Sequence, residues 1–540
     1  MMLSRRDALV VLGASATAGL LGGTAGAAPA NPSAPRMPLE EFVQTPRLVA
    51  ALRKGVTAMK KRKPSDPLSW FYQAAIHGVT PDAVTKAAAD DPGVDGVFQK
   101  RYWNQCPHFG ENSANFLPWH RGYTYHFEKI LRMHTEADDF SLPYWNYTEK
   151  ANRKFPKEFG IEHLDGNLDN NAPENINPLY LKERDFYFTG YEHPFATGLP
   201  LLELTDSAVD ITLPMSAPVF FGETEREGLG GGIADEDPST RGLLESYPHD
   251  QIHRSVGGIV GDTVGAMATP PTAAFDPIFP IHHSNIDRLW AVWACMPGKK
   301  WGKLPSSYWF NERAWFFYDT DGKVVNEPRK AYFDYRALGV RFKYEDPECK
   351  PLALPDVGKD PLRAEAVAVA RAKVVAEFPK PVSALAANRS VVSVGGKAPQ
   401  QLVGSVTAMK TRAKKENIGQ RLVLRLHGVQ LGTVPGTGFD VHLTTNPKAA
   451  LSRSDKSFVG SIALFRHGDQ GTAHQHAGGH AGGTIESFDV SGAAAAADEN
   501  LEGLSVVLVP YSLLAVPGTS TVIVGSDTLR IGKVDFLMNE

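Results

Sequence analysis

The chain has 540 residues, of which 42% are hydrophobic and 21% are charged, so it can bury a large core, and disorder over its whole length is excluded. With 56 Lys and Arg against 60 Asp and Glu, the formal net charge is -4, and no basic run is long enough for a nucleic-acid surface. Small-molecule chemistry is therefore the default class. Three cysteines are too few for a disulfide scaffold, and the odd count leaves at least one without an intramolecular disulfide partner.

The first thirty residues have the pattern of an export signal. Arg5 and Arg6 precede an apolar run of small residues from 8 to 21, and Ala-Gly-Ala and Ala-Pro-Ala follow as candidate cleavage sites. The paired arginines resemble the twin-arginine signal, which exports proteins already folded and often with a cofactor in place. No stretch reaches the ~18 to 20 apolar residues of a membrane span. We expect residues 1–30 to direct a soluble protein to the periplasm or the medium; a general secretory signal or a basic cytosolic start is the alternative.

The rest of the chain changes composition near its middle. Residues 31–350 are rich in aromatic residues, His and Pro, with long irregular stretches between helical patterns, which predicts a mainly α catalytic domain with large loops. Residues 351–380 are predicted to be a linker, with one helix over 362–378. From 381 to 540, short β-branched segments between turn residues predict an all-β, sandwich-like C-terminal domain. These segments are 421–429, 438–443, 458–465, 504–510 and 520–524.

The chemistry of the α part is concentrated in short windows that contain histidine. His120 lies in the first turn of a helix predicted from the periodic apolar residues that follow it. His249 and His253 form an i,i+4 pair, which places two imidazoles about 6 Å apart on one helix face, where both can bind one metal ion. A later helical pattern carries His282 and His283, so that a third imidazole reaches the same metal.

The ligand types indicate which metal is expected. A zinc metalloprotease of the H-E-x-x-H type needs Glu directly after the first histidine, but the chain has Asp250 there, and it has no paired-cysteine cluster. All-imidazole sites suit copper, and two such sites facing each other hold two copper ions close enough to bind O2 between them. Each window alone also fits a hydrogen-bonded core histidine, but together the windows favour a copper pair.

The windows resemble the two copper signatures of the tyrosinase and polyphenol oxidase family. The first is Phe-Leu-Pro-Trp-His-Arg at 116–121, and the second is Asp-Pro-Ile-Phe-Pro-Ile-His-His-Ser-Asn-Ile-Asp-Arg-Leu-Trp at 276–290. They occur in the family's order, with the H-x-x-x-H pair between them. The resemblance implies a four-helix bundle around a binuclear type-3 site with two copper ions. The implied ligands are His77, His108 and His120 for the first copper and His249, His253 and His283 for the second, with His282 as a non-ligand neighbour.

Cys106 stands two residues before His108. In fungal members of the family this Cys-x-His spacing carries a thioether bond from sulfur to the imidazole ring, so the resemblance implies a Cys106–His108 crosslink; a free buried thiol is the alternative. His108 and His120 are twelve residues apart where the family usually shows nine, which we interpret as a loop insertion. Cys295 and Cys349 then remain, and an exported protein can pair them, but the sequence leaves open whether they lie within bonding distance.

The resemblance also implies roles next to the substrate. Glu245, four residues before His249, corresponds to the acidic residue that holds a water near copper in plant enzymes, and such a water would help to deprotonate a phenol. Its alternative is a solvated carboxylate at a helix start. Asp250 would orient the substrate, at a position where Asn is often associated with monophenol hydroxylation, or would merely cap the helix. Pro270 replaces a bulky Phe of the plant enzymes, which implies a less obstructed substrate entrance.

The C-terminal part extends the resemblance. Gly-Phe-Asp-Val at 438–441 is similar to the Lys-Phe-Asp-Val motif of plant polyphenol oxidases, whose C-terminal domain covers the copper site and keeps the enzyme latent. This implies a shielding domain over 381–540 and a latent proenzyme. A glycine-rich loop from 467 to 480 carries His474, His476 and His480, which either hand copper to the site or belong to a solvated flexible loop.

The implied function is oxidation of o-diphenols to o-quinones by O2, with ortho-hydroxylation of monophenols in addition. The implied partners are a phenolic substrate, O2 and either an activating protease or a copper-delivery partner, without nucleic acid or a membrane span. An o-aminophenol oxidase and a hemocyanin-like O2 carrier share the histidine pattern and remain alternatives. Catechol turnover separates an oxidase from a carrier, and initial rates on catechol and o-aminophenol separate the two oxidases.

Overall fold

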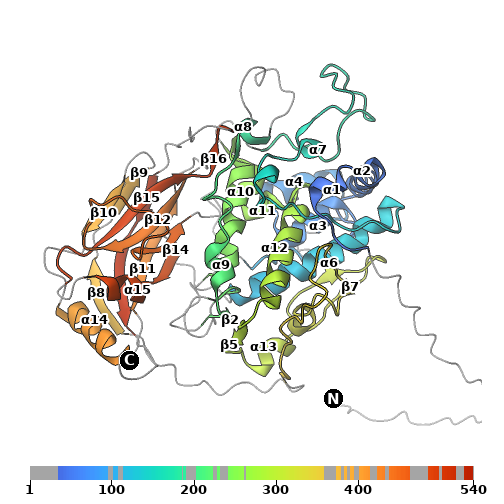
Figure 1. The fold of residues 1–540 in the computed structure, drawn as a ribbon. Coiled ribbons are helices and arrows are strands. Elements are labelled where there is room, and N and C mark those ends of the chain that lie inside the picture. Colours follow the sequence, from blue (N-terminus) through green and yellow to red (C-terminus); the bar gives the residue numbers. More distant parts are fainter. Residues whose placement is uncertain are drawn as a thin grey trace, which may run out of the picture.

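In the computed structural model, helices dominate the first part of the chain and strands the last part (Figure 1). The predicted export signal, His108 and the loop with His474, His476 and His480 lie outside the described residues. None of the helices in the described part of the chain is long and apolar enough to cross a membrane. The structure describes residues 34–94, 101–107, 113–184, 186–189, 202–222, 228–231, 241–260, 263–357, 373–378, 382–385, 389–393, 400–413, 422–431, 437–462, 484–497, 501–517 and 528–538.

The helical body, residues 34–357, is built around two central helices, α6 (Phe116–Thr135) and α12 (Phe279–Cys295), whose side chains are mostly buried. Pro280 lies in the first turn of α12, where a missing N–H costs no helical hydrogen bond. Ser69 caps α3 (Trp70–His77) by accepting the N–H of Tyr72. The other helices are α1 (Leu39–Phe42), α2 (Pro46–Lys60), α4 (Pro81–Asp90), α7 (Lys157–Gly160), α8 (Phe186–Thr189), α9 (Thr212–Ser216), α10 (Asp250–Gly257), α11 (Pro270–Ala273) and α13 (Ser307–Asn311).

Short two-stranded sheets link loop segments of the helical body. They consist of few residues each, but some of their side chains belong to the buried core, namely Phe220, Phe221, Trp301, Phe317 and Tyr318. Their pairs are β2 (Val219–Phe221) with β5 (Lys300–Gly302), β3 (Ile259–Val260) with β4 (Thr263–Val264), and β6 (Phe317–Tyr318) with β7 (Val324–Val325).

A buried ionic network fixes α12 against α6. Asp287 of α12 accepts hydrogen bonds from Arg121 of α6 at 2.6 Å and from Arg36 at 3.0 Å, and Arg36 also bonds Glu128 of α6 at 2.7 Å. The Arg121 guanidinium lies 3.4 Å from the centroid of the Trp290 ring. Because desolvation offsets much of the attraction between buried charges, the main contribution of the network is a fixed geometry between the two helices.

Cys295 at the end of α12 forms a disulfide with Cys349, with a Cα–Cα distance of 5.4 Å. This answers the question that the sequence left open, because the two residues do lie within bonding distance. The bond closes a loop across 54 positions of sequence and restrains the unfolded chain accordingly. Cys106 is not one of the two residues in this disulfide.

The β body consists of two antiparallel sheets that share one core. The strand order is β10-β15-β12-β13 in one sheet and β8-β18-β11-β17-β9 in the other, where β14 also pairs with β11. Val441 and Leu508 from the first sheet belong to the same buried cluster as Leu424 and Phe536 from the second. The strands are β8 (Lys373–Phe378), β9 (Val382–Leu385), β10 (Ser390–Ser393), β11 (Leu422–Leu431), β12 (Thr437–Thr444), β13 (Phe458–Ile462), β14 (Thr484–Asp489), β15 (Ser505–Ser512), β16 (Leu514–Ala515), β17 (Thr528–Ile531) and β18 (Lys533–Met538).

The prediction of a mainly helical part followed by a β-rich part is confirmed, whereas the four-helix bundle around two copper ions stays a prediction. The β body is not all β, because it includes the helices α14 (Gln400–Ala413) and α15 (Ser491–Ala496). The predicted strand 520–524 and residues 362–372 of the predicted linker helix lie outside the described residues.

The predicted helix over 362–378 is wrong at its end, where residues 373–378 form strand β8. The segment Lys-Val-Val-Ala-Glu-Phe pairs antiparallel with β18, the last described strand of the chain. Two adjacent valines favour an extended backbone, and the partner strand lies far away in sequence, so a local helical pattern could not reveal the pairing. The β body thus begins inside the segment predicted as linker.

The two bodies are joined by more than the chain between them. Strand β16 of the β body pairs antiparallel with β1 (Glu203–Leu204) of the helical body, close to α10 in Figure 1. Leu513 and Leu514 belong to the buried core cluster of the helical body. Thr205 donates its hydroxyl hydrogen to the carbonyl of Ser512 at 2.8 Å. A segment of the β body therefore forms part of the core of the helical body.

Candidate metal centre

Two groups of buried histidines lie next to each other between α3, α6, α10 and α12. Among the described residues, one potential metal-binding group is His77, Cys106 and His120; the other is His249, His253, His282 and His283. Within each group the candidate ligand atoms lie within 4.8 Å of one another. The rings of His120 and His283 stack with their centroids 4.3 Å apart, so the two groups form one continuous centre. The helices thus bring together residues that are 206 positions apart in sequence, from His77 to His283.

Backbone and carboxylate acceptors hold the Nδ1 atoms of four of these histidines. His77 faces the carbonyl of Pro270 at 3.0 Å, His120 that of Phe116 at 2.9 Å and His253 that of Met267 at 2.8 Å. His249 faces Oδ1 of Asp250 at 2.9 Å. An acceptor at Nδ1 fixes the proton there and leaves the lone pair of Nε2 for a metal, as is typical of histidine ligands.

The Nε2 atoms are close enough to share a metal. Nε2 of His253 lies 3.4 Å from Nε2 of His283, a distance that suits two ligands of one ion. His283 is held by ring contacts, since it lies between His120 and Phe279, whose ring centroid is 4.3 Å away. His282 on the same helix turns toward the Tyr147 hydroxyl, which lies 3.3 Å from its Nδ1.

Burial keeps these imidazoles uncharged. It lowers the pKa of His120, His253 and His283 well below the ordinary value, and neighbouring imidazoles lower it further. Burial also lowers the pKa of His282 to about 3. Neutral imidazole is the form that binds metal, so the protein presents its donors in the reactive state. The group of His249, His253, His282 and His283 is buried and consists of imidazoles alone, which fits the copper that the sequence predicts.

The ends of the site are closed by aromatic rings. Phe116 lies 4.5 Å from the His120 ring and 4.6 Å from the His249 ring, measured between centroids. Phe279 lies 4.7 Å from the His77 ring. These rings limit the rotation of the imidazoles and exclude water from their flanks.

His249 stands where the chain turns into α10. The preceding residues, Glu245–His249, are helical except at Tyr247, which is extended with φ -139° and ψ 118°. A residue before proline is sterically pushed toward this region, and Pro248 follows here. His249 directly precedes α10, and its ring centroid lies 4.5 Å from that of His253. The predicted i,i+4 pair therefore lies on one face, with His249 at the helix start.

Asp250 and Glu245 share one arginine. The carboxylate of Asp250 bonds His249 through one oxygen and Arg241 through the other, while Arg241 also bonds Glu245 at 3.2 Å. Both acids are buried. Burial raises the pKa of Glu245 above that of an ordinary carboxyl group; Arg241 opposes this rise, and Asp250 adds to it. Asp250 thus contacts the candidate ligand His249 directly, and its substrate-orienting role stays a prediction.

Pro270 lies behind His77, where its carbonyl accepts from the ring. Gly78 permits this approach, because a Cβ at that position would lie 2.7 Å from the Pro270 oxygen. The predicted entrance role of Pro270 stays a prediction, and the structure gives the residue a contact with a candidate ligand.

The residues that hold the histidines from outside have little or no signal in the sequence. Arg241 had one local signal, its i,i+4 spacing to Glu245. The carbonyls of Pro270 and Met267 had none, because any residue supplies a carbonyl. Cys106 lies with its Sγ 3.5 Å from Nε2 of His120, while its predicted partner His108 lies outside the described residues.

Comparison with known proteins finds a known domain over the region that contains both histidine groups. A profile of the common central domain of tyrosinase matches residues 67–198 and 213–295. The tyrosinase HcTyr1 of Hahella sp. (strain CCB-MM4) is 32% identical over 295 residues, which cover 50% of this chain and 55% of that protein. The chloroplastic polyphenol oxidase of Malus domestica is 26% identical over 432 residues, or 78% of this chain and 66% of that protein. The chain thus spans about half to two thirds of the length of these relatives.

The fold extends the similarity to both bodies. The structure of latent apple tyrosinase superposes with a TM-score of 0.53 at 19% sequence identity, covering 94% of this chain and 97% of that chain. At this identity the comparison shows the fold, a helical body followed by a β body. The profile match, the relatives and the histidine groups agree. Residues 67–198 and 213–295 therefore carry the common central domain of tyrosinase, and the chain is similar to tyrosinases and polyphenol oxidases, which are oxidoreductases that act on phenols.

Proposed function

We propose that the protein oxidises o-diphenols to o-quinones with O2 and also hydroxylates monophenols at the ortho position. The observation that carries this proposal is the pair of adjacent buried histidine groups with their Nδ1 atoms held by acceptors. In the proposal each copper has three imidazole ligands. They are His77, His108 and His120 for one ion and His249, His253 and His283 for the other.

The copper pair would supply the electron transfer between phenol and O2. Two catechol molecules each give up two electrons and two protons, and one O2 is reduced to two waters. In monophenol hydroxylation one oxygen atom enters the ring and the other leaves as water, and the two electrons and two protons that this requires come from the new diphenol, which leaves as the o-quinone. The chain's own contribution is to hold neutral imidazoles in a fixed orientation, to exclude water with Phe116 and Phe279, and to receive protons near Glu245.

Glu245 is expected to matter more for monophenols than for diphenols, because a monophenol must lose its proton before it is attacked. Below its raised pKa Glu245 carries a proton and cannot accept another, so the ratio of monophenol to diphenol turnover should rise as the pH increases through that pKa. The Glu245→Gln variant should flatten this rise and slow tyrosine several-fold more than catechol. Equal slowing of both substrates at every pH would show that Glu245 is structural.

We further propose that the protein is exported folded and latent, with residues 1–30 as the signal, 31–350 as the catalytic domain, and a cover that begins at β8, residue 373, rather than at the predicted residue 381. An activating protease or a copper-delivery partner would complete its maturation. The β body is well placed for a cover, since Ser461 and Tyr511 lie against the segment that carries His249.

Initial rates on catechol, o-aminophenol and tyrosine, before and after limited proteolysis or mild detergent, test the proposed function. Catechol should turn over faster than o-aminophenol, and tyrosine should react slowly. Limited proteolysis or mild detergent should raise catechol turnover several-fold. Since β16 also pairs with β1, we expect a linker cut alone to activate less than a cut followed by detergent. Binding of O2 without catechol turnover would indicate a carrier, and a preference for o-aminophenol would indicate the other oxidase.

Cys106 is proposed to form a thioether with His108 during copper-dependent maturation. Joining the two residues removes two hydrogens, which requires O2 as the oxidant and copper as the catalyst. A peptide mass spectrum of copper-matured protein should show the joined peptides two hydrogens lighter than their sum and stable to reductant. Complete alkylation of Cys106 in the same preparation would exclude the bond.

A further inference from the structure

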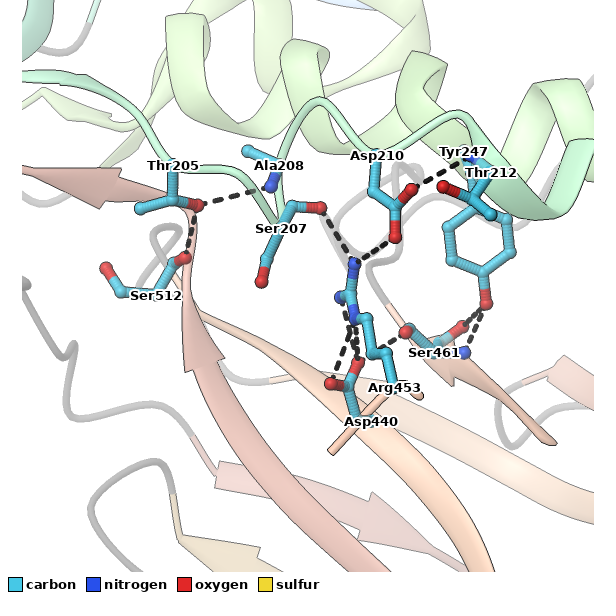
Figure 2. A network of polar contacts seen from close by, with 10 residues as sticks. All are labelled: Thr205, Ser207, Ala208, Asp210, Thr212, Tyr247, Asp440, Arg453, Ser461 and Ser512. Carbon is cyan, nitrogen blue, oxygen red and sulfur yellow. Dashed lines mark hydrogen bonds and ion pairs between the residues drawn. The ribbon is translucent and has the colours of Figure 1, made fainter. Parts of the chain in front are cut away.

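Tyr247, two residues before His249, reaches from the helical body into the β body. Its hydroxyl donates to the carbonyl of Ser461 on β13 at 2.9 Å and accepts from the N–H of the same residue (Figure 2). At Gly460 a Cβ would lie 2.6 Å from the Phe488 ring and 3.3 Å from the hydroxyl oxygen of Tyr247, so glycine leaves room for both side chains. The ring of Tyr247 is therefore fixed by two backbone groups of one strand.

Gln251, two residues after His249, makes a second contact between the bodies. In the amide orientation that satisfies its surroundings, its nitrogen donates to the carbonyls of Ser207 at 2.7 Å and Ala208 at 3.0 Å. Its oxygen accepts from the hydroxyl of Tyr511 on β15 at 3.1 Å. Gln251 is fully buried. The β body thus contacts the chain on both sides of His249.

Asp440, the acidic residue of the Phe-Asp-Val motif, organises these contacts. Its carboxylate accepts from Oγ of Ser461 and from Arg453, at 2.8 Å for the closest nitrogen (Figure 2). The guanidinium of Arg453 lies 4.4 Å from the centroid of the Tyr511 ring and pairs with Asp210 of the helical body at 3.3 Å. The Asp440 carboxylate therefore orients Ser461, and through Arg453 it also orients the ring of Tyr511. These two residues bond the segment around His249.

From these contacts we propose that the β body positions His249 for metal binding, in addition to covering the centre. The inference rests on the proposed copper function, because its main consequence is copper retention. Tyr247 is extended, so no regular helix supports His249 from its N-terminal side. The contact with Ser461 supplies that support, and the contact between Gln251 and Tyr511 holds the first turn of α10.

A cover and a positioning element have different consequences. If the β body only blocked the substrate, loss of its contacts would open the site and leave both copper ions bound. If it positions His249, loss of either tyrosine hydroxyl should loosen the copper held by His249, His253 and His283. The copper held near His77 and His120 should not change.

The experiment uses the full-length, copper-loaded protein and three single variants, Y247F, Y511F and Y318F. Each substitution removes one tyrosine hydroxyl. Tyr318 is the matched control, because its hydroxyl bonds that of Tyr72 at 2.6 Å inside the helical body, away from the interface. Copper release into excess chelator is followed over time. Amide hydrogen exchange across residues 250–257 is measured in the metal-free chain, where activity plays no part.

Two copper sites of different strength should release their ions in two phases. We expect Y247F and Y511F each to accelerate the phase of the copper held by His249 about fivefold, the effect of losing one buried hydrogen bond of about 1 kcal/mol. Exchange in α10 should rise in both variants, whereas Y318F should stay within about twofold of the wild type in both measurements. Wild-type release and exchange in Y247F and Y511F would overturn the positioning role. If the wild-type chain bound no copper, the proposed function would fail. Amide hydrogen exchange in α10 of the metal-free variants would still show whether the β body positions the segment around His249.

Discussion

Replacing His283 with alanine is expected to remove one of two bound copper ions and to lower catechol oxidation by more than about a hundredfold. The Nε2 atoms of His253 and His283 lie 3.4 Å apart, so each is a candidate ligand of one ion, and two imidazoles alone would hold that ion poorly. His253→Ala should have the same effect. Copper per chain is measured by atomic absorption, and turnover by O2 uptake with catechol.

His282→Ala is the matched control for this prediction. His282 neighbours His283 on α12, is equally buried and belongs to the same histidine group, but its Nδ1 faces Tyr147. We expect this variant to lose some stability and to keep both copper ions. A His282→Ala protein that lost one copper, beside a His283→Ala protein that kept two, would reverse the ligand assignment on α12.

Replacing Asp287 with asparagine is expected to destabilise the helical body by about 3–5 kcal/mol, the usual effect of breaking a buried ion pair. Arg121 and Arg36 would both lose a carboxylate partner while remaining buried. Urea unfolding followed by tryptophan fluorescence measures this effect selectively, because all nine tryptophans lie between Trp70 and Trp315 in the helical body.

Asp139→Asn is the control for the Asp287 substitution. Asp139 also pairs with an arginine, Arg47, but more than half of each side chain is exposed. Exposed pairs of this kind contribute about 0–1 kcal/mol. If Asp287→Asn were no more destabilising than Asp139→Asn, the ionic network would not be what fixes α6 against α12.

The histidine windows could be located from sequence because their signals are local. The i,i+4 spacing of His249 and His253 and the apolar periodicity after His120 depend on a few neighbouring residues, and helices preserve that spacing. The structure accordingly places these histidines in two adjacent groups. Their mutual arrangement, such as the stacking of His120 on His283, depends on how α6 packs against α12 and has no local signal.

Features that need a distant partner could not be predicted in the same way. Strand β8 is stabilised by pairing with β18, and without that distant partner in view its local pattern predicts a helix. The motif at 438–441 indicates a relative of the plant enzymes. That Asp440 accepts hydrogen bonds from Arg453 and Ser461 depends on the tertiary fold and has no signal in the motif. Backbone carbonyls that hold histidines carry no sequence signature at all.

The proposed function requires that six histidines of this chain hold two copper ions close enough to react with O2 together. To test this, the full-length protein is loaded with copper, the metal is counted, and hydrogen peroxide is added while the near-ultraviolet spectrum is recorded. We predict about two copper ions per chain, no paramagnetic resonance signal from isolated Cu(II), and the strong near-ultraviolet band of a bridged copper pair. One copper per chain, or two with the resonance of separate Cu(II) ions and no such band, would contradict the claim.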